Sequence, residues 1–118
     1  MLKSAHKTLD VYKLSLALVK MIYETTRRFP KEEQYLLVIQ LRRAAISVCS
    51  NIAEGSSRIS GNEKKRFYEI ARSSVAEIDT QIEIAINLNF LDFREIKPLE
   101  ENIESIFRML SKMIRNLS

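Results

Sequence analysis

Residues 42–59 read RRAAISVCSNIAEGSSRI, and the way this stretch folds decides the architecture of the chain. Apolar or small residues recur through it at alternating steps of three and four, the spacing of one helix face: Val38, Leu41, Ala45, Val48, Ile52, Gly55 and Ile59. Because this line passes through Gly55 and continues to Ile59, we predict one helix over residues 31–59, with Ala45 and Gly55 at helix-packing positions. Glycine inside a helix costs about 1 kcal/mol against alanine, but it lets a neighbouring helix approach closely. A helix that ends with Gly55 as its C-cap is the alternative.

The remaining sequence predicts three more helices joined by short connections. Two Gly and two Pro in 118 residues are too few for the frequent turns of a sheet protein. Pro30 disfavours helical geometry in the residue before it and separates the first helix from the second. Ser60 and Glu63 have the capping-box spacing that begins a helix, and Asn87 or Asn89 can end that helix in the left-handed conformation. The helices are expected at about residues 9–29, 31–59, 62–89 and 92–117.

The last helix has the apolar line of a bundle helix, with steps of four and three: Leu99, Ile103, Ile106, Leu110, Met113 and Leu117. Pro98 suits a helix interior poorly, so a loose lead-in turn is expected at residues 92–97. The chain also has the usual length of one domain. We therefore assign it to the all-α class, as a four-helix bundle with long helices and short connections. Residues 9–118 form the domain, after a flexible basic leader at residues 1–8.

A polar stripe runs beside the apolar line of the second helix. If the second and third helices pack antiparallel across a turn near residue 61, residues whose numbers add up to about 122 lie level. Arg43 is then near Glu77, a carboxylate that shares one side of its helix with Ile70 and Ile84, where an unpaired charge is costly. We expect Arg43, or Arg42 of a neighbouring chain, to pair with Glu77. The predicted structural polar network is Arg42, Arg43, Asn51, Glu54, Arg58 and Glu77.

Two helices carry more apolar surface than one core can absorb. The first helix has a second apolar line, formed by Tyr12, Leu16, Val19 and Tyr23. The second helix has another apolar face, formed by Ile39, Ile46, Cys49 and Ala53. Large unpartnered apolar faces are typical of interaction surfaces, so we predict self-association into a homo-oligomer.

The positive charge of the chain is uneven. The net charge is +4, and residues 1–31 hold seven Lys or Arg against two acidic residues, a net charge of +5. A basic end on a neutral body attracts polyanions. The candidate nucleic-acid-binding residues are Lys13, Lys20, Arg27, Arg28 and Lys31. A solvated helix face without a partner is the alternative interpretation.

Residues able to carry catalysis are scarce. His6 is the one histidine, which excludes the paired Glu-x-x-His motifs of di-iron bundles and the common zinc sites. Cys49 is the one cysteine, lies between apolar residues and is expected to be a packing residue. Neither a phosphate-binding glycine loop nor a G-x-S-x-G motif is present. We predict no catalytic, cofactor-binding or metal-binding residues, no small-molecule substrate and no enzymatic activity.

The sequence also indicates where the protein works. Its first residues are polar and basic, without the apolar segment of a signal peptide. No apolar stretch approaches the roughly 20 residues that a membrane span requires. A single cysteine fits a reducing compartment. A cytoplasmic protein without membrane contact is expected.

Two longer motifs resemble a known family. The runs RRAAISVCSNIAEGSSR at 42–58 and FYEIARSSVAEI at 67–78, with FP at 29–30 and NFL at 89–91, resemble bacterial four-helix-bundle proteins encoded in intervening sequences of 23S rRNA genes. The resemblance covers nearly the whole chain, and its RRAA…S…NIAEG…R motif is fairly specific, whereas Pro98 is less usual. The matching positions are Arg42, Arg43, Ala44, Ala45, Ser47, Asn51, Ile52, Ala53, Glu54, Gly55, Arg58, Phe67, Ala71, Ser74 and Glu77.

This resemblance implies an antiparallel up-down bundle, and a homopentameric, barrel-like assembly is known among relatives. It also implies similarity to the accessory protein of diversity-generating retroelements, a basic pentamer that works with a reverse transcriptase and nucleic acid. The implied partners are further copies of the chain, RNA or DNA, and a protein such as a reverse transcriptase.

Two functions of different classes follow from the residues and the resemblance. The first is a non-enzymatic accessory module that binds nucleic acid through its basic surface. The second is a structural or protein-interaction oligomer that does not bind nucleic acid. Binding that depends on the basic residues favours the first, and a protein partner insensitive to them favours the second.

Overall fold

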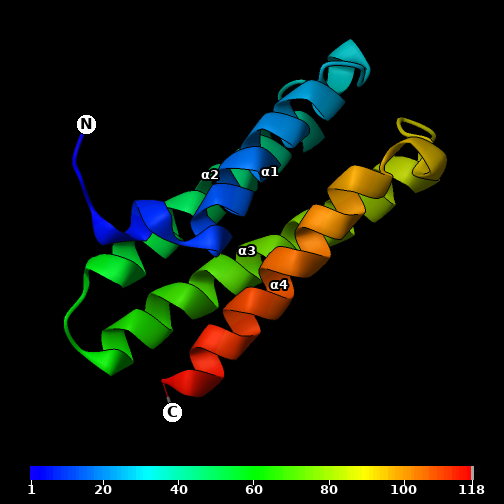
Figure 1. Cartoon of the computed structure of the whole chain (residues 1–118). Coiled ribbons are helices and arrows are strands. Elements are labelled where there is room, and N and C mark those ends of the chain that lie inside the picture. The colour runs from blue at the N-terminus through cyan, green and yellow to red at the C-terminus, as the bar shows by residue number, and fades with distance from the viewer. Residues whose placement is uncertain (118) are drawn as a thin grey trace.

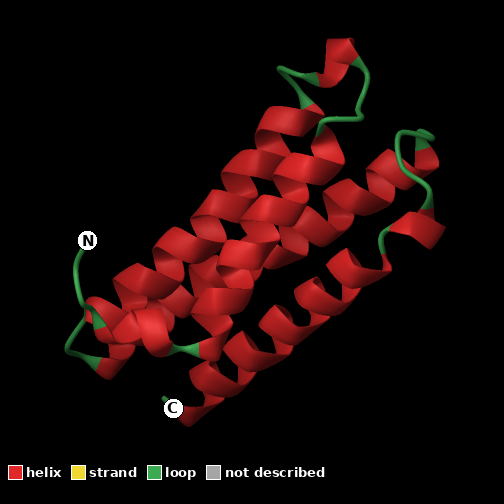
Figure 2. Ribbon diagram, turned by 45° about the horizontal axis from the view of Figure 1, so that its top comes forward, coloured by secondary structure: helices red, strands yellow, loops and turns green. Residues whose placement is uncertain are grey.

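The computed structural model describes residues 1–117, in which four α-helices and three short 3-10 helices are connected without a strand (Figure 2). The α-helices are α1 (Asp10–Thr26), α2 (Leu37–Ser57), α3 (Gly61–Asn87) and α4 (Lys97–Asn116). The 3-10 helices are η1 (Ala5–Thr8), η2 (Lys31–Glu33) and η3 (Phe93–Glu95). The predicted all-α fold class is confirmed. Ser118, with which the predicted domain ends, lies outside the described residues.

The helices form a closed ring of neighbours. Contacts join α1 to α2, α2 to α3, α3 to α4 and α4 back to α1, and the α2–α3 contact is the most extensive. Figure 1 shows that the α1–α2 and α3–α4 connections lie at one end of the bundle. The α2–α3 connection and both termini lie toward the other end (Figure 1). Sequential helices therefore run in opposite directions, as in an up-down bundle.

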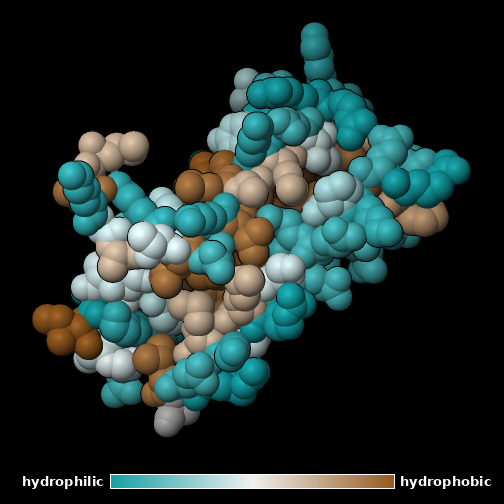
Figure 3. Space-filling view, in the orientation of Figure 1, coloured by the Kyte–Doolittle hydropathy of each residue, from teal (hydrophilic) through white to brown (hydrophobic). Residues whose placement is uncertain are grey.

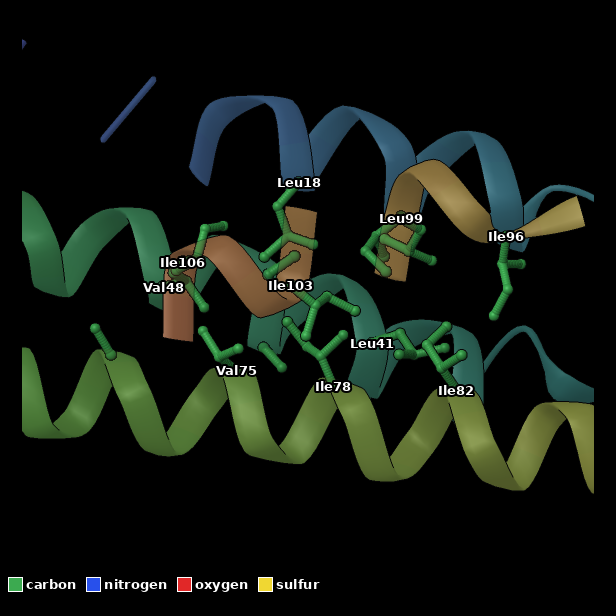
Figure 4. Close-up of a cluster of buried hydrophobic side chains, with 14 of the residues drawn as sticks. Leu18, Leu41, Val48, Val75, Ile78, Ile82, Ile96, Leu99, Ile103 and Ile106 are labelled. Atoms are coloured by element: carbon green, nitrogen blue, oxygen red, sulfur yellow. The ribbon is translucent and has the colours of Figure 1, made fainter. Parts of the chain in front are cut away.

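Each helix contributes one apolar line to a common core. In Figure 4, labelled side chains from all four helices point toward one another. Removing these side chains from water stabilises the fold by about 25 cal/mol per Å² of apolar surface. The largest fully buried apolar side chains are Leu18, Ile22, Leu41, Val48, Ile52, Val75, Ile78, Ile106 and Leu110.

The first connection differs most from the sequence prediction. Helix α1 ends at Thr26 rather than at residue 29, and α2 begins at Leu37 rather than at residue 31. Between them η2 makes a single 3-10 turn, and the backbone at Leu36 is non-helical, with φ −120° and ψ −102°. This longer route lets Phe29 and Leu37 both enter the core, where their exposed fractions are 7% and 9%. The predicted start of the second helix at residue 31 is therefore wrong by about two turns.

Gly55 lies inside α2, on the core side, as predicted. It lies two residues before the last residue of the helix, and its φ is not positive, so the C-cap alternative is not realised. The helix nevertheless stops at Ser57, and Ile59 is fully exposed. The helix ends there because the N-cap of α3 follows almost at once. Ser60 is extended, with φ −76° and ψ 143°, and its side chain accepts a hydrogen bond from the Glu63 backbone N–H at 3.0 Å.

The other predicted boundaries agree more closely. Asn89 has a positive φ of 63° just beyond α3, one of the two expected positions. The lead-in turn before the last helix is present as η3, with Asp92 as its cap. Pro98 stands in the first turn of α4, where its missing N–H has no helical partner to lose. None of the helices within residues 1–117 is long and apolar enough to cross a membrane.

The amino-terminal segment covers part of the surplus apolar surface. η1 contacts both α1 and α2, and the His6 ring meets the Tyr12 ring edge-on at 4.7 Å between centroids. Tyr12 and Val19 are half-buried, whereas Leu16 and Ile46 remain 50% and 45% exposed. The predicted leader thus includes a helical turn that packs on the bundle.

Replacing Gly55 with alanine is expected to destabilise the protein, although alanine favours a helix by about 1 kcal/mol. An added Cβ would lie 2.7 Å from Tyr68 Cε1 and 3.2 Å from Phe67 Cβ. The Tyr68 ring has little room to move, because it is buried and its hydroxyl shares a 3.0 Å hydrogen bond with Ser56. Overpacking of this kind costs about 1–3 kcal/mol. Urea denaturation should therefore show a net loss of up to about 2 kcal/mol in the free energy of unfolding.

The matched control is Gly61→Ala, since a Cβ at Gly61 would meet no atom within 4 Å. That variant should be neutral or slightly more stable. Equal losses in the two variants, or a gain from Gly55→Ala, would show that α2 and α3 do not approach closely at Gly55.

Candidate nucleic-acid interface

The five candidate basic residues lie on α1 and on the connection that follows it. Lys13 and Lys20 are exposed on α1, Arg27 and Arg28 follow its last residue, and Lys31 begins η2. Within residues 1–117, Lys13, Lys20, Arg27 and Lys31 take part in none of the ion pairs. Four positive charges are therefore exposed to solvent without a carboxylate partner.

Arg28 differs from the other four. Its Nη1 donates to Glu95 Oε2 at 2.9 Å, which joins the α1–α2 connection to η3. The two side chains are 58% and 56% exposed, so the pair contributes at most about 1 kcal/mol to stability. The neighbouring Phe29 ring packs against Phe90, with 5.6 Å between centroids. Arg28 thus helps to join two connections, and its charge is compensated.

Arg42 reaches from α2 to α1. Its Nε donates to Thr26 Oγ1 at 3.0 Å and one Nη donates to the Tyr23 carbonyl oxygen at 3.4 Å. The guanidinium carbon lies 4.3 Å from the centre of the Tyr23 ring, a cation–π contact. Thr26 is itself buried and donates to the Ile22 carbonyl oxygen at 2.7 Å. These contacts hold the half-buried guanidinium in one place.

The predicted pairing of Arg43 with Glu77 does not form within the chain. Both side chains are exposed, and neither takes part in an ion pair in the described residues. The pair does not form because that side of α3 faces water in the single chain. Ile70 and Ile84, which share it, are 38% and 44% exposed, so the carboxylate of Glu77 is hydrated there without a partner cation.

The remaining members of the polar network, Asn51, Glu54 and Arg58, lie on the last turns of α2 and at its C-cap. Asn51 donates to both the carbonyl oxygen and the hydroxyl of Ser47, at 2.9 and 3.0 Å, and the Ser47 hydroxyl meets that of Ser74 at 3.0 Å. Glu54 and Arg58 form an ion pair at 3.2 Å. The Arg58 guanidinium also lies over the Phe67 ring, at 4.7 Å from its centre. Two of these contacts therefore link α2 to α3: the Arg58–Phe67 contact near the shared turn, and the Ser47–Ser74 hydrogen bond farther along the pair.

Sequence reasoning missed the donor that closes the end of α2. Lys64 Nζ donates to the Ser56 carbonyl oxygen at 3.1 Å and to that of Gly55 at 3.4 Å. The last carbonyl groups of a helix lack intrahelical partners, and cations are favourable there. The sequence signal for this contact was Lys64 itself, a lysine near the start of α3 on the side that faces the end of α2.

A surface hollow, here called the turn hollow, lies between the end of α1, η2 and the start of α2. Its lining includes the cationic Arg27, Lys31 and Arg42 together with Thr26 and Gln34, and no carboxylate side chain lines it. Sequence reasoning placed Arg42 in the structural network and did not join it to the basic set. The conformation of residues 27–36 brings them together, and this conformation has no periodic signal in the sequence.

Cys49 behaves as a packing residue. Its thiol donates to Ser15 Oγ at 3.0 Å, and burial raises the pKa of this thiol despite that hydrogen bond. Activated cysteines show the opposite direction of pKa shift. Within the described part of the chain, no group of three His, Cys, Asp or Glu side chains could hold a metal ion.

Exchanging Arg42 for lysine should lower stability, because lysine cannot keep both the Thr26 hydrogen bond and the planar contact with Tyr23. We expect a loss of about 1–2 kcal/mol in the free energy of unfolding. Arg43→Lys is the matched control on the exposed neighbouring position and should change stability by less than about 0.5 kcal/mol. Thermal or urea denaturation measures both, and equal effects would contradict the assigned role of Arg42.

Comparison with known proteins identifies the family of the chain. The family model described as 23S rRNA-intervening sequence protein matches residues 7–112, from η1 through most of α4. No curated protein matches the chain. Because the family match extends over far more than half of its length, the chain belongs to the 23S rRNA-intervening sequence protein family.

Proposed function

We propose that this protein is a non-enzymatic, self-associating cytoplasmic module that binds nucleic acid through the basic surface of α1 and η2. The observation that carries the proposal is a group of exposed cations on α1 and the connection after it, none of which takes part in an ion pair in the described chain: Lys13, Lys20, Arg27 and Lys31. Exposed charges of one sign attract phosphate backbones by releasing counterions. The rest of the chain has a net charge close to zero, so this surface is where a polyanion is favoured.

Self-association strengthens the proposal, because one bundle offers few phosphate contacts. Apolar side chains remain at the surface along two sides of the bundle, with Leu16 and Ile46 on α1 and α2, Ile70 and Ile84 on α3, and Leu88 directly after α3. Figure 3 shows hydrophobic atoms reaching the surface in the middle of the molecule, with hydrophilic atoms around them. Copies that cover these faces would bring several basic surfaces together, and weak contacts then add. Resemblance to relatives suggests a pentamer.

A protein-binding role is the second candidate. It is favoured by a groove between α3 and α4 in which Val75, Ile103 and Phe107 lie beside Asp79 and Glu104. Phe107 is 42% exposed there. A partner such as a reverse transcriptase fits the resemblance to retroelement accessory proteins, and its binding should not depend on the lysines of α1.

Charge reversal on α1 tests the nucleic-acid proposal. Gel shifts with structured RNA should show that Lys13→Glu and Lys20→Glu each weaken binding several-fold, since each removes a phosphate contact and adds a repulsive charge. Affinity should also fall steeply with salt, and each variant should reduce the slope of log K against log salt by about one unit.

Lys112→Glu, at an exposed position of α4, is the matched control and should leave RNA binding nearly unchanged. Equal weakening by all three variants would mean that net charge alone matters. Absence of salt-sensitive RNA or DNA binding would remove this function in favour of the protein-binding role.

Light scattering tests self-association. The purified chain should have a solution mass equal to that of two or more chains of 13.7 kDa each. Introducing lysine at Leu16 and Ile46 together, or at Ile70 and Ile84 together, should lower that mass if the altered face is an interface, because burying the new charges is unfavourable. A native monomer at micromolar concentration would contradict the proposal.

A further inference from the structure

We propose that the turn hollow binds a single phosphate group. Arg27, Lys31 and Arg42 line this hollow together with the polar residues Thr26 and Gln34. No carboxylate side chain lines it, so its three cations are not neutralised from within. Where the phosphate belongs to a nucleic-acid backbone, the inference rests on the proposed function and specifies its strongest contact.

Arg42 is the fixed element of the hollow. A guanidinium has five N–H groups, and the hydrogen bonds to Thr26 and to the Tyr23 carbonyl oxygen use two of them. The cation–π contact with the Tyr23 ring, at 4.3 Å, restricts the guanidinium further. An arginine held in this way loses little further freedom when it binds an anion with paired hydrogen bonds. Its partial burial also weakens screening of its charge.

Arg27 and Lys31 are the adaptable elements. Both are exposed, and neither has an ion-pair partner within residues 1–117. The acidic residues of η2, Glu32 and Glu33, do not line the hollow. Glu95, which reaches this end of the bundle, is bound to Arg28. A bound phosphate would therefore meet three cations without displacing an internal ion pair.

A second hollow at the same end shows why charge balance matters. It lies at the α3–α4 connection and includes Arg28 and Arg94, but Asp92 and Glu95 line it as well. Arg94 binds Asp92 at 2.6 Å and lowers the pKa of that carboxyl group to about 2. Its cations are already paired with carboxylates, so an added anion would compete with them. The turn hollow has no such competitor.

The chemistry identifies a phosphate group but allows two sources, a nucleic-acid backbone and a free phosphate ion. The first experiment titrates the ¹⁵N-labelled protein with inorganic phosphate against chloride at constant ionic strength, followed by NMR. Saturable shifts are expected in residues 26–34 and at the Arg42 Nε–H. Arg27→Gln and Lys31→Gln should each weaken phosphate binding by about tenfold, as expected for a lost charged hydrogen bond.

Arg43→Gln is the matched control, because Arg43 neighbours Arg42 but does not line the hollow. Arg42→Gln should abolish saturable binding. If the Arg42→Gln protein is too unstable to measure, Arg27→Gln and Lys31→Gln still decide the test, because both residues are exposed. Shifts that spread over all basic residues without saturating, or phosphate affinity unchanged in both Arg27→Gln and Lys31→Gln, would overturn the inference.

The second experiment repeats the RNA gel shifts with the same variants and separates the sources. If Lys31→Gln weakens RNA binding more than Lys13→Gln, the hollow holds a backbone phosphate. If phosphate saturates the hollow but no RNA or DNA binds, the hollow takes free phosphate, and the inference survives while the proposed function fails. If RNA binds but phosphate does not saturate the hollow, and Lys31→Gln equals Lys13→Gln, the inference fails and the proposed function survives.

Discussion

The close approach of α2 and α3 at Gly55 is the contact on which the rest of the structure depends. The edge of the buried Tyr68 ring occupies the space that a Cβ at Gly55 would need, 2.7 Å from Tyr68 Cε1. Farther along the same helix pair, the Ser47 and Ser74 hydroxyl groups meet at 3.0 Å. Small side chains bring the two backbones together, and this explains why α2 and α3 share the most extensive helix contact. The antiparallel pair then serves as the surface on which α1 and α4 pack.

That pairing also determines what gathers at each end of the bundle. Because α2 and α3 turn back on each other at Ser60, the connections to α1 and α4 both lie at the opposite end (Figure 1). The Phe29–Phe90 ring contact and the Arg28–Glu95 ion pair join those two connections. The same ion pair occupies Glu95, so the acidic side chain of η3 does not neutralise the turn hollow. The connections between the helices thus keep the carboxylate of Glu95 away from the cations of the turn hollow.

Much of the fold could be predicted from residue spacing, but the basic site could be predicted only in part. The antiparallel register of the second and third helices is confirmed by Ser47 opposite Ser74 and by the hydrogen bond between Gln40 and Gln81 at 3.1 Å. Helical periodicity specifies which side of a helix is buried, so core and register could be inferred together. The periodic spacing of apolar residues ends where a helix ends. Residues 27–36, which shape the turn hollow, lie between α1 and α2 and have no such periodic spacing. The contact of Arg42 with Tyr23 was missed for the same reason, since it depends on how α1 ends.

The placement of the hollow has a consequence for assembly. The apolar side chains that remain exposed, such as Leu16, Ile46 and Ile70, lie along the lengths of the helices, whereas the turn hollow lies at one end. Copies packed side by side in the same direction would bury the apolar surfaces and leave each hollow open at the same rim. Hydrophobic burial and phosphate binding would then use separate surfaces, so neither would displace the other. A ring of such hollows would present spaced cations to a single polyanion, and contacts that are weak in one copy add when the copies are linked. The proposed self-association would then support the proposed nucleic-acid binding through geometry, without any further charge in the sequence.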